Sequence, residues 1–145
     1  SVGERDFAKT MFAEVGLELV FSKVAMKPGK PVWLGRAGER LVMGLPGNPS
    51  SALVTARLLL VPLLQGLTGR VPELGWRELP LAGPLDGAGG RETFSRGWEA
   101  NGAVHLFAHQ DSSAQKVLAE ANLLVRRPPG SDPLAAGSRV RVLDF

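Results

Sequence analysis

The first sixteen residues carry the apolar pattern of one short helix. The apolar positions that fall on one helix face are Phe7, Met11, Phe12 and Val15. Asp6 precedes them and is a residue type that caps helix N-termini, and Gly16 is expected to end the helix. Apolar and polar residues then alternate loosely from 17 to 26, which predicts a strand.

Two apolar runs and a long apolar segment follow this strand. Residues 32–35 and 40–44 flank a connection at 36–39, which predicts a pair of strands. Residues 50–67 are apolar almost all round, which predicts a buried helix, and Pro62 is expected to kink or split it. Strand, turn and helix in this order, with apolar runs able to form parallel strands, predict part of a three-layer α/β domain.

The pattern changes near Gly69, Pro72 and Gly75, and we place a boundary there between a domain at 1–71 and a domain at 72–145. These residue types interrupt helices and strands, so a linker is the expected structure.

Beyond the boundary the pattern is that of short strands. Residues 77–82 predict a strand, and the Gly/Pro-rich residues 83–90 predict a loop. The runs 91–100 and 103–108 flank Asn101-Gly102, which is a strong hairpin signal. The remaining expected elements are a short helix at 112–122, with Ser112 or Ser113 as N-cap, and strands at 123–126 and 139–143. A small β domain is therefore expected.

Composition limits the class of protein. The chain has 145 residues, 44% hydrophobic and 21% charged, which is enough for one ordinary domain or two small ones and excludes a disordered tail. It has no cysteine, which excludes disulfides and thiolate metal sites and favours an intracellular protein. No signal-like N-terminus is present. The longest apolar run, 52–64, is too short for a bilayer span of about 20 residues.

Charge is unevenly distributed. Between 19 and 72 there are seven basic residues and one acid, Glu39, which is a local excess of +6. This excess favours an anionic ligand. Nucleic acid is disfavoured as the partner, because aromatic residues do not alternate with the bases as a stacking surface requires.

Two Gly/Pro turns stand at the edges of apolar runs. The first, 27–31, reads Lys-Pro-Gly-Lys-Pro and carries two ammonium groups. The second, 45–49, reads Leu-Pro-Gly-Asn-Pro and ends where a helix is expected to start. A cationic loop and an open helix N-terminus together predict a site for phosphate or another oxyanion.

Motifs along the chain resemble one family. The more specific ones are residues 1–7 (SVGERDF), 23–31 (KVAMKPGKP) and 44–52 (GLPGNPSSA), and shorter ones are 94–97 (FSRG), 110–112 (QDS) and 121–122 (AN). In this order they resemble the molybdopterin molybdenumtransferase family, of the MoeA and gephyrin E-domain type. The family's full chain is much longer, so we expect a C-terminal part of such an enzyme. Asp111 stands where the family has a glycine.

The resemblance implies a fold and three catalytic residues. The fold is a partial three-layer pterin-binding α/β domain followed by a small all-β barrel domain. The catalytic residues are Asp6, Lys23 and Lys27, with Asp6 as a Mg²⁺ ligand. From the residues alone, a helix cap for Asp6 and solvated surface positions for the lysines are the alternatives.

The resemblance also implies substrate-binding residues, which are Lys30, Pro46, Gly47, Asn48, Pro49, Arg96 and Ser112. Gly47 would let a ligand approach the backbone closely, and Asn48 could cap the helix or bond a pterin amide edge. Arg96 is either a solvated cross-strand charge or an oxyanion ligand through its planar fork. Ser112 is either a helix cap or a site residue.

Other residue types offer no competing chemistry. His105 and His109 lack a convincing third ligand for a metal, and no nucleophile–base arrangement supports a hydrolase. The three tryptophans are expected to pack in cores or interfaces.

The function implied is insertion of molybdate into adenylylated molybdopterin with release of AMP, in molybdenum cofactor biosynthesis. The implied partners are those two substrates and a second subunit in a cytoplasmic homodimer, without nucleic acid or membrane. Because the family's site is built between two subunits and several domains, we expect the chain alone to be inactive. The alternatives are a non-catalytic pterin-binding or scaffold module and the related molybdopterin adenylyltransferase, which lacks the terminal β domain.

Overall fold

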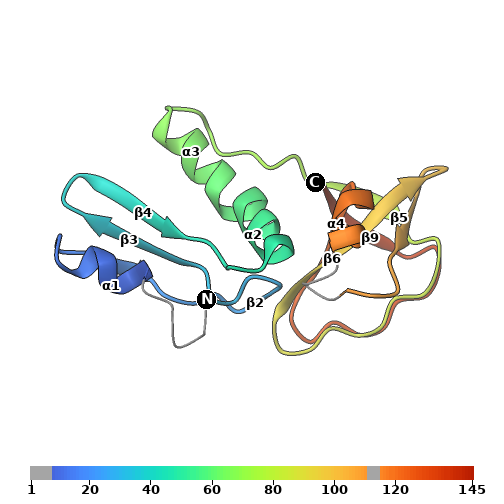
Figure 1. Cartoon of the computed structure of the whole chain (residues 1–145). Coiled ribbons are helices and arrows are strands. Elements are labelled where there is room, and N and C mark those ends of the chain that lie inside the picture. Colours follow the sequence, from blue (N-terminus) through green and yellow to red (C-terminus); the bar gives the residue numbers. More distant parts are fainter. Residues whose placement is uncertain (1–7, 111–114) are drawn as a thin grey trace.

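A computed structural model describes residues 8–110 and 115–145 (Figure 1). In the first part, a three-stranded sheet lies beside a long helix, and in the second part a six-stranded sheet curls round on itself. Asp6 and Ser112 lie outside the described residues. A mixed α/β part followed by a β-rich part is the order that the sequence predicted.

The first helix, α1, spans Ala8–Ala13. Gly16 has φ +73°, and its N–H donates to the carbonyl of Ala13 over 3.1 Å, while Leu17 N–H donates to that of Phe12 over 3.2 Å. A left-handed residue with these two bonds closes a helix C-terminus, so Gly16 ends the helix as predicted.

The strands of the first sheet are all antiparallel, so the apolar runs that could have formed parallel strands do not do so. They are β1 (Glu18–Phe21), β3 (Trp33–Ala37) and β4 (Arg40–Gly44), in the order β1-β3-β4. The β3–β4 pairing runs from Trp33↔Gly44 to Ala37↔Arg40 around a two-residue turn, so the two apolar runs form a hairpin.

The single strand predicted for 17–26 is also wrong. It divides into β1 and β2 (Met26–Lys27), because Val24 N–H bonds to Lys30 O and Met26 N–H to Val24 O, which turns the chain out of the first sheet. β2 instead pairs in parallel with β6 of the second part, with Met26 opposite Glu92 and Lys27 opposite Thr93.

The long helix continues across Pro62. It consists of α2 (Pro49–Thr55), a π-helical segment η1 (Ala56–Leu60) and α3 (Val61–Leu67). Proline removes one N–H donor and crowds the carbonyl four residues earlier, and the wider π turn just before Pro62 accommodates this.

The predicted burial of this helix holds for one side only. Val54 and Thr55 are fully buried, whereas Leu53 and Leu64 are 50% and 51% exposed. Among the described residues, this long helix is the one that is long and apolar enough to cross a membrane, with 19 residues and a mean hydropathy of 1.5. The helix predicted at 50–67 has nearly this length, whereas the apolar run 52–64, which was expected to be too short for a span, is only part of it. Core helices of soluble proteins meet the same criterion.

The second part is a small barrel. Its strands are β5 (Arg77–Pro80), β6 (Glu92–Ala100), β7 (Ala103–Leu106), β8 (Leu123–Arg127) and β9 (Arg139–Asp144), with the helix α4 (Gln115–Glu120) between β7 and β8. The sheet order is β2-β6-β8-β9-β5, and β7 also pairs with β6, on the side opposite β8. A parallel bridge between Leu81 and Val104 joins the end of β5 to β7 and closes the barrel.

Strand β8 is buried on both of its faces. Leu123 and Val125 pack inside the barrel, with partners such as Val142, while Leu124 points the other way into a second cluster with Val54 of the long helix. Leu123, Leu124 and Val125 are each 1% exposed or less. A single strand thus belongs to both cores.

The β6–β7 hairpin has the predicted turn. Asn101 and Gly102 have φ of 52° and 72°, and Ala100 pairs with Ala103 across them. Two consecutive left-handed residues are the signature of a type I′ turn.

Gly97→Ala tests how closely β6 and β7 are packed. A Cβ at Gly97 would lie 2.4 Å from the backbone oxygen of His105, so one of the two strands must shift. We expect the free energy of unfolding to fall by about 1–3 kcal/mol in urea denaturation. Gly83→Ala is the matched control, because a Cβ there has nothing within 4 Å, and its stability should be unchanged or slightly higher. Equal stability of the two variants would contradict the packing described.

Candidate functional site

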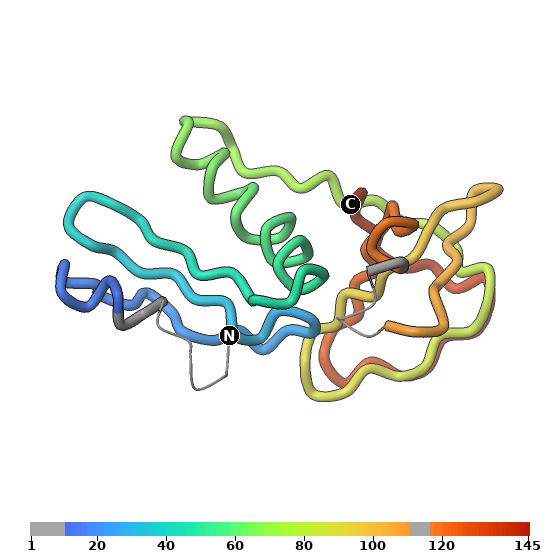
Figure 2. The backbone as a smooth tube through the Cα atoms, viewed as in Figure 1, coloured from blue at the N-terminus to red at the C-terminus, as the bar shows by residue number. Residues whose placement is uncertain are grey.

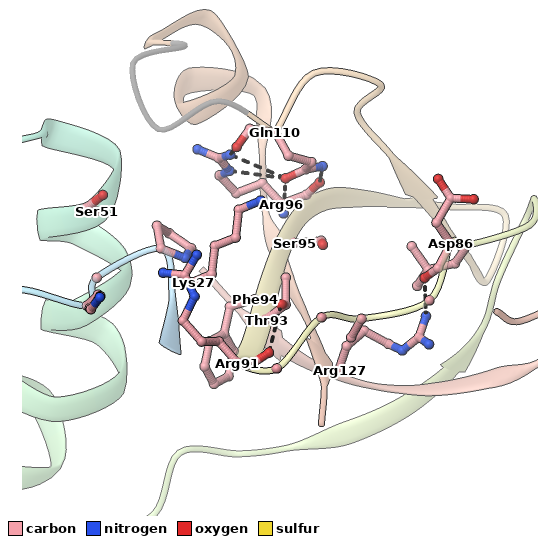
Figure 3. Close-up of a pocket in the computed structure, with 18 of the residues that line it drawn as sticks. Lys27, Ser51, Asp86, Arg91, Thr93, Phe94, Ser95, Arg96, Gln110 and Arg127 are labelled. Carbon is pink, nitrogen blue, oxygen red and sulfur yellow. Dashed lines mark hydrogen bonds between the residues drawn. The ribbon is translucent and has the colours of Figure 1, made fainter. Parts of the chain in front are cut away.

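A cavity of about 740 Å³ opens where the two parts meet (Figure 3). Its walls are the 27–31 turn, the first turn of α2, the strand β6 and a segment at 85–91, which we call the glycine loop. Volumes of this size are typical of sites for small-molecule ligands.

The cavity is strongly cationic. The basic residues that line it are Lys27, Lys30, Arg91, Arg96 and Arg127. Asp86 is the one acidic residue among the described lining residues, so five cations face one anion, a net charge of +4. Low-dielectric walls carrying one sign of charge concentrate counter-ions, so the ligand that this cavity favours is an anion.

The lysine turn is held in place from two sides. Pairing of β2 with β6 puts Lys27 opposite Thr93, at the cavity wall. Gly29 has φ +110°, and a Cβ on it would lie 2.4 Å from the Cγ2 of Thr55, so the turn lies directly on the long helix. Lys27 and Lys30 are both exposed, which leaves their ammonium groups available to a ligand.

Arg96 is buried at the junction of the two parts, with 1% exposure, so it is not a solvated cross-strand charge. Its guanidinium donates to the Oγ of Ser50, in the first turn of α2, and to the backbone oxygen of Gln110. Arg96 also lines the cavity, so its guanidinium lies where an anionic ligand would bind. An oxyanion-binding role for Arg96 therefore stays a prediction that its placement supports.

Gln110 fixes the backbone of Arg96. Its side-chain Oε1 accepts from Arg96 N–H at 2.9 Å, and its Nε2 donates to the Arg96 carbonyl at 2.8 Å and to that of Phe107 at 2.9 Å. β7 ends at Leu106, so the side-chain amide of Gln110 bonds to the backbone of β6 at the position just beyond the β6–β7 ladder. The sequence motif contained Gln110, but nothing in the sequence indicated this role.

Asn48 occupies the N-cap position of α2 but does not cap it. Its φ and ψ are −77° and 125°, and its side chain makes no cap hydrogen bond. Its Oδ1 is buried and has no hydrogen-bond partner among the described residues, 8–110 and 115–145. Buried acceptors are normally satisfied, so the predicted contact between Asn48 and a ligand stays a prediction.

The structure brings together part of the predicted site. Lys27, Lys30 and Arg96 line one cavity, whereas exposed Lys23 and the residues 46–49 are not among its lining residues. Ser51, just after that second turn, does line it. Of the turn, Pro46 is buried and Gly47 and Pro49 are exposed. Asp6 and Ser112 lie outside the described residues, so their predicted roles stay predictions.

Sequence reasoning missed the glycine loop and Arg127. Residues 83–90 were predicted only as a connection, and the strand predicted at 123–126 stopped one residue before Arg127. The concentration of glycines followed by Arg91 was the signal available in the sequence, but a glycine-rich stretch alone is as often a simple turn.

Comparison with known families agrees with this architecture. Residues 1–66 match the family described as a probable molybdopterin binding domain, and residues 78–145 match the MoeA C-terminal region (domain IV). The chain belongs to the MoeA family.

Curated MoeA relatives align over the whole chain. It is 38% identical to the molybdopterin molybdenumtransferase of Synechococcus elongatus over 98% of its length, and 42% identical to that of Haemophilus influenzae over 100%. A crystal structure of the molybdopterin biosynthesis MoeA protein from Pyrococcus horikosii superposes with a TM-score of 0.82 at 28% identity, over 97% of the chain. The chain spans 36%, 37% and 35% of these three proteins, respectively.

Arg96→Lys tests the junction of the two parts. Lysine keeps the charge but cannot reach Ser50 and Gln110 together, so buried acceptors lose their donor. We expect the free energy of unfolding to fall by about 2–3 kcal/mol in urea denaturation. Arg91→Lys, at an exposed position on the same cavity, is the control and should leave stability unchanged. Unchanged stability of Arg96→Lys would show that these hydrogen bonds do not join the two parts.

Proposed function

We propose that the chain acts in molybdenum cofactor biosynthesis, within an enzyme that inserts molybdate into adenylylated molybdopterin and releases AMP. The observation that carries this proposal is the cationic cavity at the junction of the two parts, in a chain whose relatives are named molybdopterin molybdenumtransferase. Both proposed substrates are anions, which is the ligand class that the net charge of the cavity favours.

The cavity residues would act by binding and electrostatic stabilisation. Molybdate is an anion, and bringing it to an anionic dithiolate costs electrostatic energy. Lys27, Lys30 and Arg96 supply fixed positive charge that lowers this cost where the two reactants meet. The sulfur chemistry itself belongs to the pterin.

Mg²⁺ is part of the proposal through Asp6. In the part of the chain that the structure describes, no group of three or more His, Cys, Asp or Glu side chains could hold a metal ion. The magnesium site therefore stays a proposal, and no step of the reaction is assigned to the ion. His105 stacks on Trp98 with ring centroids 5.2 Å apart, which is a packing role.

The proposed setting is a cytoplasmic homodimer that binds these substrates and neither nucleic acid nor membrane.

The adenylyltransferase alternative is weaker, because residues 78–145 match the terminal region of MoeA. Lys23 and the 46–49 turn stay proposed contacts for parts of the substrate outside the cavity. In that turn, Asn48 Oδ1 is the proposed acceptor for a hydrogen bond from the substrate. A pterin-binding module without turnover is the second candidate, since the same residues would bind without reacting.

Titration calorimetry with molybdate tests the proposed oxyanion site. We expect the chain to bind molybdate and Lys27→Ala to weaken binding by about three- to tenfold, because an exposed ammonium contributes a screened contact. Arg40→Ala is the control, since Arg40 is equally exposed but lies at the far end of the β3–β4 hairpin. Absence of molybdate binding, or equal loss in both variants, would contradict a site on the lysine turn.

A further inference from the structure

We infer that the far end of the cavity, formed by the glycine loop and backed by Arg127, is a second anion subsite that takes a phosphate group of the ligand. The inference rests on the proposed function, because the adenylylated pterin carries phosphate groups distinct from the molybdate. Lys27 and Arg96 lie on one side of the cavity, and Asp86 and Arg127 lie on the other, beyond Thr93 and Ser95 of β6 (Figure 3).

The size of the cavity calls for a ligand longer than one oxyanion. A volume of about 740 Å³ is within the range of sites for whole small molecules, and far more than one tetrahedral anion fills. The positive charge also continues past the lysine turn, because Arg127 lies at the far end, whereas Arg91 lies near Lys27 (Figure 3). A ligand with two separated anionic groups fits this distribution.

Arg127 supplies buried charge behind the glycine loop. It is 3% exposed, and its guanidinium donates to the backbone oxygen of Asp86 at 3.1 Å and to that of Asp132. Both acceptors are neutral carbonyl groups, so no carboxylate among these hydrogen-bond partners cancels its charge. A buried and uncancelled charge acts over a longer range than a solvated one, and its potential reaches the cavity through the loop.

The glycine loop exposes backbone at this end of the cavity. A Cβ on Gly89 or Gly90 would meet nothing within 4 Å, and neither residue has a left-handed φ. Neither steric crowding nor backbone conformation therefore requires glycine at these two positions. Close approach of a ligand to the backbone is a use of glycine that does explain them.

Donors for an anion are present in the same loop. Among the described residues, none accepts a hydrogen bond from the backbone N–H of Gly87, Gly89 or Gly90. Closely spaced backbone N–H groups are a common phosphate-binding element. Together with the positive charge of Arg127, they give this end of the cavity the features that a phosphate needs.

The loop is held in place before any ligand binds. It runs beside residues 128–134 (Figure 2), with hydrogen bonds from Ala88 N–H to Ser131 O at 2.8 Å and from Gly130 N–H to Gly89 O at 3.0 Å. Leu85 and Leu134 pair at its start, and Arg127 bonds to both segments. A preformed loop loses little conformational entropy on binding, which favours the ligand.

Titration calorimetry with AMP, at saturating molybdate, tests the subsite. Molybdate occupies the lysine end, so the binding measured is that of the phosphate at the other end. We expect Arg127→Lys, which keeps the charge but loses the fork, to weaken AMP binding by about three- to tenfold. Asp86→Asn removes the acid of the lining, and we expect it to tighten AMP binding by about two- to threefold. Asp86 is exposed, so this variant tests the subsite even where Arg127→Lys affects folding.

Controls separate this inference from the proposed function. Adenosine, which lacks the phosphate, should bind far more weakly than AMP, and Arg40→Gln should bind AMP as the unmodified chain does. Molybdate binding that depends on Lys27, with AMP affinity unaffected by Asp86→Asn, would overturn the subsite and leave the proposed function standing. Loss of molybdate binding itself would instead remove the support for the proposed function. Failure of AMP to bind the unmodified chain also overturns the subsite.

Discussion

The packing of the long helix against the outer face of the barrel is the interaction on which the rest of the structure depends. Val54 and Leu58 of the helix join Phe94, Leu124 and Leu143 of the barrel in one buried cluster. Burial of such side chains stabilises the folded state by roughly 1.5–3 kcal/mol each. Here it also fixes the distance between the long helix and the barrel. The lysine turn is packed on the helix, and Arg96 and the glycine loop belong to the barrel. The width of the cavity is therefore set by this cluster.

Polar contacts at the same junction determine orientation more than stability. Arg96 reaches Ser50 on the helix and Gln110 on the barrel, and it can satisfy both only when the two parts are correctly turned. Arg57 bonds from the helix to the carbonyls of Leu74 and Asp144 at 2.8 and 2.9 Å. Arginines that bridge a junction in this way contribute specificity of arrangement, since fork geometry tolerates little rotation.

The parts of the fold that could be predicted from the sequence are turns and helix ends formed by neighbouring residues. The left-handed Gly16, the Asn101-Gly102 turn and the β3–β4 hairpin depend on residues close together in the chain, and all three were predicted. The pairing of β2 with β6 joins residues more than sixty positions apart, and no local pattern specifies it. The same reason explains the site: motif residues Lys27, Lys30 and Arg96 were found, whereas Arg127 and the glycine loop acquire meaning only through contacts between distant segments.

The parallel pairing of β2 with β6 has a consequence for how the two parts can be separated. Met26 and Lys27 lie early in the chain, yet their strand is an edge of the sheet of the barrel. A cut at the linker would leave β6 with unpaired backbone groups at that edge, and exposed edges recruit other chains. The barrel is thus not a self-contained module, although its sequence is contiguous. Any evolutionary exchange that transferred residues 78–145 alone would also have to supply a new strand for this edge.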